Sequence, residues 1–575
     1  MRPGGEYFTE PEEPTQRRYE ALRAYFIEEL TASEVAARFG YSPQVVHQMA
    51  SELRAGKAQF FASSKPGPKG PRKSERIRDR VLEHRARERS VSEIAQALGA
   101  EGTPVSAQTV WAILHSEGLE RLERRPVVQR GAPPPRLSPI KARAIPHWPT
   151  GISLPCDHAG LFLLVPGIVE LSLHELISAC NYPSTKVLSA WHSLGSLLLA
   201  KCARKPRASH THALADDDAL GLLLGLTALP KATHLTSYSY RVRRHSNEQL
   251  MAGVCRRLRE LGLATAEEGF NLDFHAIRHH GEDTPLEKHY VPRRSQRTRA
   301  VLTFFAQDHA STEMVYANAD LTKAEQAREI IAFADYWQNV TGADPGLLVF
   351  DSKLTTTYKV LSELTERGIR WLTLRERGPK LMAELAALPA SEWKTVTVER
   401  SGRYRQPEIH DQIIKIKDIE GPVRQLAVRN IGRDQPTLLI TNDLERTTKH
   451  LFARYAERMG IENELDAYIS GFHLDALSSG LPLNVDLDTT LTVIAGNLYR
   501  HLARKLPRYE HATPDRLWRR FLDSTGTLHV GEDTLTLELR VRTYHPVLID
   551  AGLADQTTPI PWLDDRQLRF RFPPR

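Results

Sequence analysis

Residues 347–351, Leu-Leu-Val-Phe-Asp, and residues 455–463, Tyr-Ala-Glu-Arg-Met-Gly-Ile-Glu-Asn, decide the interpretation of this chain of 575 residues. The first stretch predicts a short buried strand that ends in the carboxylate of Asp351, at the rim of a sheet. The second carries polar side chains spaced i, i+3 and i+7, which one helix would place on a single face: Tyr455, Arg458 and Glu462. A strand-end aspartate and a glutamate on a helix are hard oxygen ligands for a divalent cation, and a nearby arginine can hold a phosphate. The two stretches therefore predict a metal site for phosphoryl transfer.

A third carboxylate is found upstream, in residues 269–277, Gly-Phe-Asn-Leu-Asp-Phe-His-Ala-Ile. Asp273 lies in the middle of this predicted strand and would complete a set with Asp351 and Glu462. Other acidic residues are close enough in the sequence to take its place: Glu268, Glu282 and Asp283.

With these three carboxylates, the chain resembles the DDE transposases of bacterial insertion sequences, in the group marked by a Tyr-x2-Arg-x3-Glu-x6-Lys signature. Tyr455, Arg458 and Glu462 match at the required spacing. The lysine position is Ile469, so that phosphate contact is absent or comes from elsewhere. Two further stretches fit the same group: Thr441-Asn442 at the end of a predicted strand, and residues 369–375 after a predicted helix. The resemblance covers about residues 266–510 well and the flanks loosely.

The resemblance implies a DNA transposase that binds the terminal inverted repeats of its element and catalyses metal-dependent strand cleavage and strand transfer. Asp273, Asp351 and Glu462 would be the catalytic residues and would hold two Mg²⁺ ions, for which Mn²⁺ substitutes. Water would be the first nucleophile, and the freed 3′-hydroxyl the second. Tyr455 and Arg458 would contact DNA; the alternatives are that Arg458 only pairs with a carboxylate and that Tyr455 is simply half-buried. The partners implied are double-stranded DNA, at element ends and target, and further copies of the chain in a homodimer or higher synaptic complex.

Composition and charge agree with a DNA-binding protein. The net charge of +7 and the pI of about 9.1 favour a polyanionic partner. The four cysteines have no metal-ligand spacing, which indicates reduced thiols: Cys156, Cys180, Cys202 and Cys255. No segment approaches ~18 uninterrupted apolar residues, and the amino terminus has no signal-peptide core. These features lead us to expect a cytoplasmic protein with no membrane partner, and the resemblance implies that it is bacterial and associated with the nucleoid.

The amino-terminal part contains a diverged repeat of the helix-turn-helix pattern. Residues 31–46 and residues 90–111 each contain Ser-Glu-(Val/Ile)-Ala at a helix start, then a glycine (Gly40 or Gly99). Ser42 and Ser106 are predicted N-caps of the second helices, over 42–53 and 106–117, which would enter the DNA major groove. Their candidate base-reading residues are Gln44, His47 and Gln108. The alternative is a pair of helical hairpins without a DNA role.

A Pro/Gly-rich basic segment, residues 64–73, joins the two copies and predicts an extended, non-helical linker. Its cations would follow a phosphate backbone or lie in a minor groove: Lys65, Lys69, Arg72 and Lys73. The alternative is a solvated spacer. The domains expected here are a first helix-turn-helix (1–60), the linker (61–73) and a second helix-turn-helix (74–145).

Residues 146–265 predict a helical DNA-binding or connecting domain, because apolar residues recur at helical spacing. His210 and His212 are only a weak metal candidate, since no further ligands are placed nearby. The cluster at residues 236–245 is polar, aromatic and basic, and it either grips DNA or caps the helical layer.

From residue 266 strands and helices alternate in the order of a ribonuclease H-like domain, which the resemblance also implies. That catalytic domain is expected over 266–380 and 435–510, with a β-rich insertion at 381–434 and a C-terminal β or oligomerisation segment at 511–575. The fold class is therefore multidomain: tandem helix-turn-helix α domains, a helical domain, and an α/β ribonuclease H-like domain with a β-rich insertion. Two rival functions stay open. One is a catalytically silent, domesticated transposase that binds DNA sequence-specifically, and the other is a structure-specific nuclease.

Overall fold

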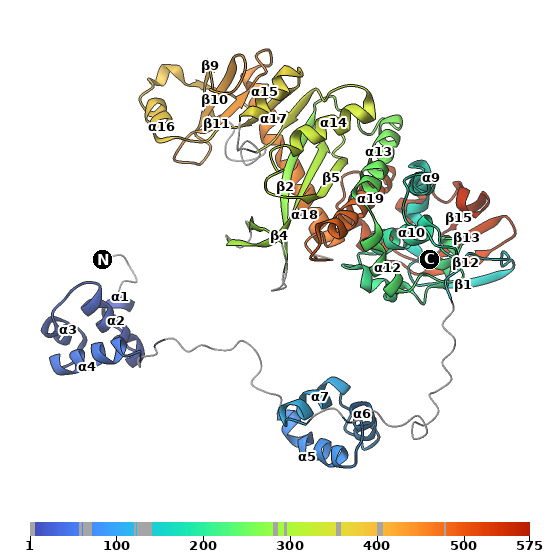
Figure 1. Ribbon diagram of the computed structural model, residues 1–575, viewed down its shortest axis with the longest axis horizontal. Coiled ribbons are helices and arrows are strands. Elements are labelled where there is room, and N and C mark those ends of the chain that lie inside the picture. The colour runs from blue at the N-terminus through green and yellow to red at the C-terminus, as the bar shows by residue number, and fades with distance from the viewer. Residues whose placement is uncertain are drawn as a thin grey trace. The chain divides into compact units, whose positions relative to one another are not determined.

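The computed structural model describes residues 6–56, 60, 72–119, 122, 141–279, 286–291, 296–351, 358–398, 406–476 and 479–574. The chain is a mixed α/β protein in two compact units, Met1–Arg136 and Leu137–Arg575 (Figure 1). Each unit has hydrophobic cores of its own.

The amino-terminal unit contains two three-helix groups. In the first, α2 (Pro14–Phe26), α3 (Ala32–Phe39) and α4 (Pro43–Arg54) surround a core that includes Leu22, Val35 and Val46, and a short α1 (Glu6–Thr9) precedes them. In the second, α5 (Arg72–Ala86), α6 (Val91–Ala100) and α7 (Ala107–Ser116) surround Val81, Ile94 and Val110. The predicted N-caps are confirmed, because the Ser42 and Ser106 side chains accept hydrogen bonds from the backbone N–H groups of Val45 and Thr109.

Two sequence predictions for this unit are wrong in detail. Gly99 is not the turn of the second copy, since it lies inside α6; the left-handed residue is Gly102, with φ 76°. Arg72 and Lys73 are not part of a non-helical linker, because α5 begins at Arg72, directly after Pro71, where proline commonly precedes or opens a helix. Residues 61–71, with Lys65 and Lys69, lie outside the described residues.

The larger unit is built on one extended mixed sheet (Figure 1). Its strands have the order β3-β4-β2-β6-β7-β11-β10-β9-β8, and β5 pairs with β4 as well. β2 runs antiparallel to β4 and parallel to β6, and β6 runs parallel to β7. The strand bounds are β2 Phe270–Arg278, β3 Lys288–Val291, β4 Gln296–Asp308, β5 Met314–Leu321, β6 Leu347–Val349, β7 Arg370–Leu374, β8 Lys394–Thr395, β9 Glu408–Ile414, β10 Val423–Arg429 and β11 Thr437–Thr441.

Residues 381–434, predicted as a β-rich insertion, add strands to this same sheet. β11 pairs with β7, and β10, β9 and β8 follow outward, so the sheet continues without a gap from β2 to β8. α16 (Pro379–Ala386) packs its apolar face against β10 and β11, next to Trp393.

Helices cover both faces of the sheet. α14 (Glu329–Thr341) packs Phe333 and Trp337 against Phe270 of β2, and α15 (Lys359–Glu366) lies between β6 and β7 in the chain. Before α14, Thr322 caps a separate turn by donating to the Glu325 carboxylate, so α14 begins only at Glu329. α17 (Thr448–Glu457), α18 (Met459–Phe472) and α19 (Pro482–Lys505) complete this part.

The segments at the two ends of the larger unit fold together. β1 (Ile152–Cys156) pairs with β12 (Gly526–Val530) in a second sheet of order β1-β12-β13-β15-β14. Residues 146–265 are therefore not purely helical, and the segment 511–575 packs back on them. The remaining bounds are α8 Val165–Glu170, α9 Leu173–Ala179, α10 Ala190–Cys202, α11 Asp218–Leu223, α12 Ala232–Tyr238, α13 Arg244–Glu260, β13 Thr534–Leu539, β14 Thr557–Ile560, β15 Arg566–Arg571, α20 Pro514–Leu517 and α21 His545–Asp550.

Within the described part of the chain, no single helix has the length and apolar character needed to cross a membrane. Residues 159–170 and 173–179 meet that requirement only as a pair bent by 63°, and their apolar side chains belong to the main core of the larger unit.

Candidate active site

The two predicted aspartates lie in one row at an edge of the large sheet. In the parallel pair of β2 and β6, Phe270 is opposite Leu348 and Asn271 is opposite Val349. Continued for two more residues, that register would align Asp273 with Asp351, which follows the last residue of β6 by two positions, and neighbouring strands are separated by about 4.8 Å. Gly269 permits this register: its φ is 75°, and a Cβ there would lie 2.2 Å from the Leu347 carbonyl oxygen.

One face of β2 presents polar side chains to α17 and α18. Because side chains alternate along a strand, Phe270, Leu272 and Phe274 face the α14 side, and the residues between them face the other way. Each of these polar residues meets a partner from the α17–α18 segment. The pairs are Asn271 Oδ1 with Arg454 Nη1 at 2.7 Å, Asp273 Oδ1 with Arg458 Nη1 at 3.9 Å, and His275 Nε2 with Asp475 Oδ1 at 2.7 Å.

The Tyr455–Glu462 segment is not one continuous helix, which corrects the sequence prediction. α17 ends at Glu457, α18 begins at Met459, and Arg458 lies at the junction. The junction is overwound, since the Arg458 N–H donates to the Tyr455 carbonyl and the Ile461 N–H donates to the Arg458 carbonyl, three residues apart in both cases. Tyr455 and Glu462 nevertheless both remain beside Arg458.

Arg458 is the centre of the cluster. Its Nη2 donates to Glu462 Oε1 at 2.6 Å, and its guanidinium lies 5.8 Å from the centre of the Tyr455 ring. Its side chain is 8% exposed, yet Nε and Nη1 have no hydrogen-bond partner. A buried guanidinium with unused donors is a fixed cation available to an anionic ligand.

The electrostatics show that the three carboxylates act on one another. Burial raises the pKa of Asp273 to about 6; Arg458 opposes this rise, while the charges of Glu462 and Asp351 add to it. Burial lowers the pKa of Arg458, but the neighbouring anionic groups together raise it above its ordinary value: Tyr455, Asp273, Glu462 and Asp351. The cluster therefore carries more negative charge than Arg458 neutralises.

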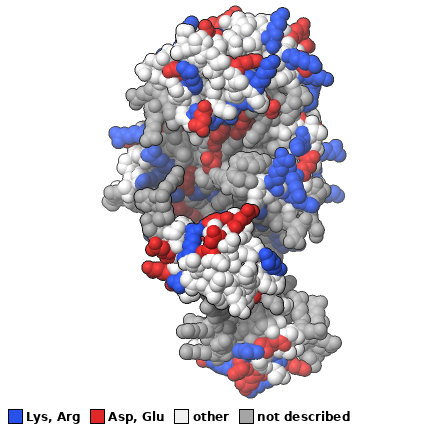
Figure 2. Space-filling view, turned by 90° about the vertical axis from the view of Figure 1, so that its left-hand side faces the viewer, with Lys and Arg blue, Asp and Glu red and all other residues white. Residues whose placement is uncertain are grey.

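The donor set suits a hard divalent cation, because it consists of carboxylate oxygens whose mutual repulsion a cation would relieve. Among the described residues, however, no group of three or more His, Cys, Asp or Glu side chains is already arranged around a metal position. Asp273 and Glu462 are turned toward Arg458. Figure 2 shows acidic side chains inside a hollow on one face of the larger unit, with Lys and Arg side chains gathered beside it.

The predicted base-reading residues are available at the surface of the amino-terminal unit. Gln44 and His47 on α4 and Gln108 on α7 are all exposed. For the linker cations, Lys65 and Lys69 lie outside the described residues, as do the side chains of Arg72 and Lys73.

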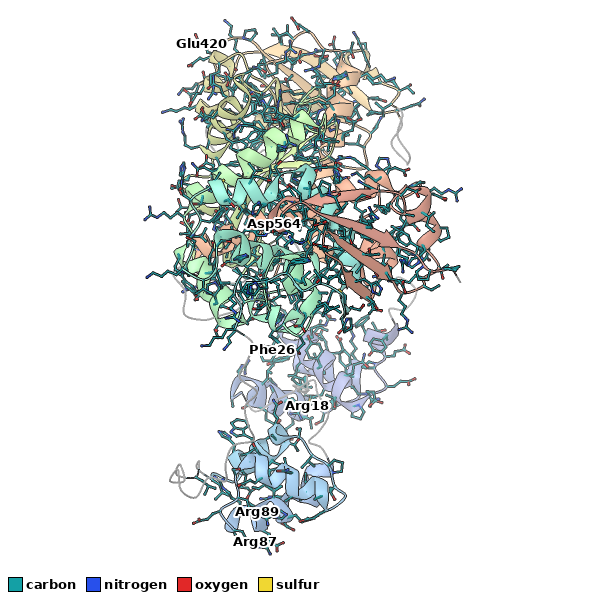
Figure 3. All side chains as sticks on the ribbon, turned by 90° about the vertical axis from the view of Figure 1, so that its right-hand side faces the viewer. Arg18, Phe26, Arg87, Arg89, Glu420 and Asp564 are labelled. Atoms are coloured by element: carbon teal, nitrogen blue, oxygen red, sulfur yellow. The ribbon has the colours of Figure 1, made fainter. Side chains whose placement is uncertain are left out.

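Several candidate functional residues were not predicted from the sequence. Trp111 on α7 is 50% exposed, and its ring centre lies 4.9 Å from that of His115. It was not predicted because a tryptophan in a helix is usually buried. Arg87 and Arg89, labelled in Figure 3, add positive charge at the turn between α5 and α6. Arg454 is 2% exposed, and burial lowers its pKa to about 10. Arg454 precedes Arg458 by four residues, and this helical spacing in the sequence could have identified it.

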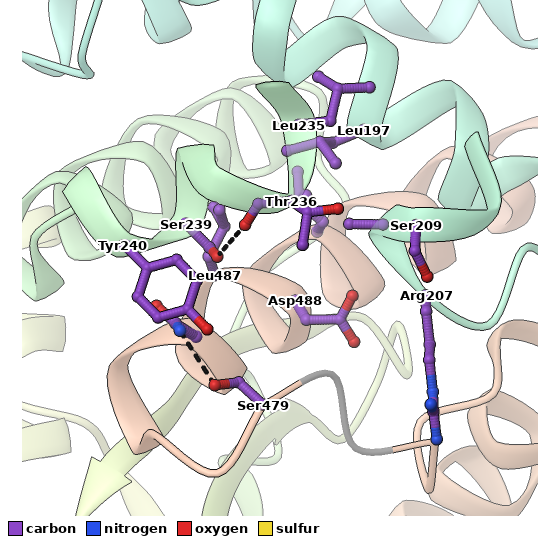
Figure 4. Close-up of a pocket in the computed structure, with 13 residues that line it drawn as sticks. Leu197, Arg207, Ser209, Leu235, Thr236, Ser239, Tyr240, Ser479, Leu487 and Asp488 are labelled. Carbon is purple, nitrogen blue, oxygen red and sulfur yellow. Dashed lines mark hydrogen bonds between the residues drawn. The ribbon is translucent and has the colours of Figure 1, made fainter. Parts of the chain in front are cut away.

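The cluster at residues 236–245 divides into structural and exposed parts. Arg244 donates to Asp486 Oδ1 at 2.7 Å, so it fastens α13 to α19. Tyr240 is 62% exposed and stands at a pocket with Arg207, Ser209 and Asp488 (Figure 4). The rings of His210 and His212 are 6.3 Å apart, and no metal group is found around them in the described residues.

Ile469, at the position where the signature has lysine, packs against the main hydrophobic core from α18. Its half-buried side chain therefore serves packing. No protein-family model matches this sequence, and no curated protein matches it either.

Proposed function

We propose that this chain is a metal-dependent DNA phosphoryl transferase of the DDE type, a transposase that cuts and joins DNA at the ends of its element. The observation that carries the proposal is the grouping of Asp273 on β2, Asp351 just after the adjacent parallel strand β6, and Glu462 beside Arg458.

The order of the strands supports this reading. With the short edge strand β3 left aside, the strands β2, β4, β5, β6 and β7 have the spatial order β5-β4-β2-β6-β7, that is 3-2-1-4-5 in order of appearance, and β6 and β7 run parallel to β2. A ribonuclease H-like domain was expected from the same alternation in the sequence. In an open sheet, ligands bind beyond the carboxyl ends of parallel strands, where Asp351 lies.

The residues divide the work by their chemistry. Asp273, Asp351 and Glu462 would hold two Mg²⁺ ions, which activate an attacking hydroxyl and stabilise the leaving oxygen when bound. Arg458 donates to a non-bridging phosphate oxygen through its unpartnered Nε and Nη1, and so orients the phosphodiester. Tyr455, next to Arg458, keeps the guanidinium in place.

The amino-terminal unit would supply sequence recognition. Its two three-helix groups each present a capped second helix with exposed polar side chains, as helix-turn-helix proteins do in the major groove. Two such groups on one chain suit binding to two patches of a terminal repeat, and copies of the chain would meet on paired element ends.

A nicking assay tests the proposal. The full chain is incubated with Mg²⁺ and a supercoiled plasmid that carries the DNA flanking its own gene. We expect the wild-type chain to nick the plasmid, and EDTA to stop the nicking. Asp351→Asn should reduce nicking by at least roughly 1,000-fold while it retains its affinity for DNA. Asp550→Asn, an exposed carboxylate at the end of α21, is the matched control and should nick normally. Undiminished nicking by Asp351→Asn would refute the proposal.

A second candidate function is a silent DNA-binding protein descended from such an enzyme. It is favoured by the contact between Glu462 and Arg458, which engages one carboxylate, and by Ile469 in a packing role. The same assay separates the two, since this protein would bind the flanking DNA and leave it uncut at every Mg²⁺ and Mn²⁺ concentration.

A further inference from the structure

A second cationic site lies at the end of β7, where the insertion joins the sheet. Arg375 and Arg377 follow β7, Arg433 lies between β10 and β11, and Thr437 begins β11; together they line one pocket. Its volume of about 390 Å³ is within the range of ligand pockets, roughly 300–1,000 Å³, so it can take a sugar-phosphate unit.

This pocket lies at the same edge of the sheet as the carboxylates. In the parallel pair of β6 and β7, Val349 is opposite Leu372, so Leu374 continues the row of Asp351. Arg375 is the next residue, so its side chain turns to the other face of the sheet, toward Gln425, while Leu374 keeps the face of Asp351. Two strand spacings separate Arg375 from the line of Asp273, on the order of 10 Å. That separation is comparable to one or two nucleotides of a DNA strand.

The polar groups in and beside the pocket are held by hydrogen bonds, and some of their donors have no partner. Arg375 donates through Nη1 to Gln425 Oε1, and its backbone N–H donates to the Leu438 carbonyl at 2.9 Å. Gln425 is fully buried with its Nε2 unpartnered, and the Thr437 hydroxyl has no partner either.

The charge balance favours an anion. Within the described residues, no ion pair is found for Arg375, Arg377 or Arg433, whereas Arg571 pairs with Glu538 and Arg519 with Asp515. The single carboxylate in the pocket wall is Glu376, which is exposed. Three guanidinium groups with planar, paired donors match the oxygens of a phosphate better than they match any neutral ligand.

We propose that the pocket formed by Arg375, Arg377, Arg433 and Thr437 binds a backbone phosphate of the DNA strand whose neighbouring phosphodiester lies at the carboxylates. The proposal rests on the proposed function for the identity of the ligand as DNA. The contact is independent of base sequence and positions the strand, because it addresses phosphate oxygens alone.

The salt dependence of DNA binding tests this pocket. The full chain is titrated with a 40-bp duplex of arbitrary sequence at several salt concentrations, and the slope of log Kd against log salt is measured. Arg377→Ala with Arg433→Ala should flatten that slope by roughly one unit, since each lost phosphate contact removes about one. Arg375 is left intact because it holds buried Gln425. The control is Arg519→Ala with Arg571→Ala, which removes two cations that are 72% and 63% exposed.

A loss of slope no larger than that of the control pair would overturn the proposal. A crosslinking experiment gives a second, independent test. The four native cysteines are buried, so in the Arg433→Cys variant the new cysteine is the accessible thiol among the described residues. By thiol–disulfide exchange it should form a disulfide with a duplex whose phosphate tethers end in an activated mixed disulfide, releasing the tether's leaving thiol, whereas Arg571→Cys should not. Equal crosslinking at both positions would also count against the pocket.

The outcome is separable from that of the proposed function. If the wild-type chain never nicks DNA but the double variant loses slope, the pocket stands as a DNA-binding surface and the catalytic proposal fails. If nicking depends on Asp351 but the slope is unchanged, the enzyme stands and this pocket does not.

Discussion

Two carboxylates in the larger unit, Asp486 and Asp273, differ in how fully their oxygens are used. Asp486 on α19 is fully buried and accepts three hydrogen bonds: from Arg244 at 2.7 Å, from Asn247 at 2.7 Å and from the Ala319 backbone N–H at 2.9 Å. Asp273 accepts one, from the backbone N–H of Phe274 at 2.9 Å, and Arg458 stays 3.9 Å away.

The difference separates a structural carboxylate from one kept for a ligand. Asp486 joins α13, α19 and β5, and every acceptor contact it makes is internal. Asp273 has a side chain that is 20% exposed, and its partial burial, with the like charges of Glu462 and Asp351 beside it, raises its pKa to about 6. Folding tolerates that cost only if the rest of the unit compensates, as is common at functional sites. The comparison predicts opposite responses when each carboxylate is removed.

The largest effect is expected at Asp486. Asp486→Ala would leave the Arg244 guanidinium buried without its anion, which should lower the free energy of unfolding by about 3–5 kcal/mol. Urea unfolding followed by tryptophan fluorescence measures this, since seven of the eight tryptophans lie in Leu137–Arg575. Asp550→Ala is the exposed control, expected within about 0.5 kcal/mol of wild type. A loss at Asp486 no greater than the control would end the distinction.

Asp273→Asn should act in the opposite direction. The pKa of Asp273 is about 6 in the folded state and near 3.8 ordinarily, so the folded chain binds the extra proton between these pH values. Stability therefore falls as pH rises through that window, and the full cost is present above about pH 6.

In EDTA at pH 8, Asp273→Asn should consequently be more stable than wild type by about 1–3 kcal/mol, and the gain should disappear toward pH 4. Thermal unfolding of both proteins across this pH range provides the measurement. If Asp273→Asn were less stable than wild type at pH 8, Asp273 would belong with Asp486 as a structural carboxylate.

The smallest effect is expected at His275, the last residue of the polar face of β2 that contacts the segment after α18. His275 pairs with Asp475 at side-chain exposures of 23% and 38%. Exposed pairs contribute little, so His275→Asn should cost less than about 1 kcal/mol of stability. Nicking should fall by no more than about threefold, as measured in the plasmid assay. Abolished nicking would extend the active site along β2 to His275.

Parts of this architecture were predictable because they depend on local sequence. β10 (Val423–Arg429) and β11 (Thr437–Thr441) are examples, since apolar runs flanked by turn residues determine both. The caps at Ser42 and Ser106 follow from residue type alone.

Other parts depend on contacts between distant segments. The alignment of Asp273 with Asp351 follows from strand register, which the two isolated stretches do not specify. β1 was not predicted because β12, with which it pairs, lies near the other end of the chain. The break between α17 and α18 at Arg458 was not predicted, because the i, i+3, i+7 spacing of Tyr455, Arg458 and Glu462 fits a straight helix equally well.

Binding of Mn²⁺ tests the central claim most directly. In thermal unfolding of the full chain, the midpoint of the wild type should rise with MnCl₂, equivalent to about 2.7 kcal/mol at a hundred times the Kd. Asp273→Asn and Glu462→Gln should show no such rise, while Asp486→Asn, although less stable, should keep it. A rise of equal size in Asp273→Asn and wild type, or no rise in wild type, would contradict a metal site at these carboxylates.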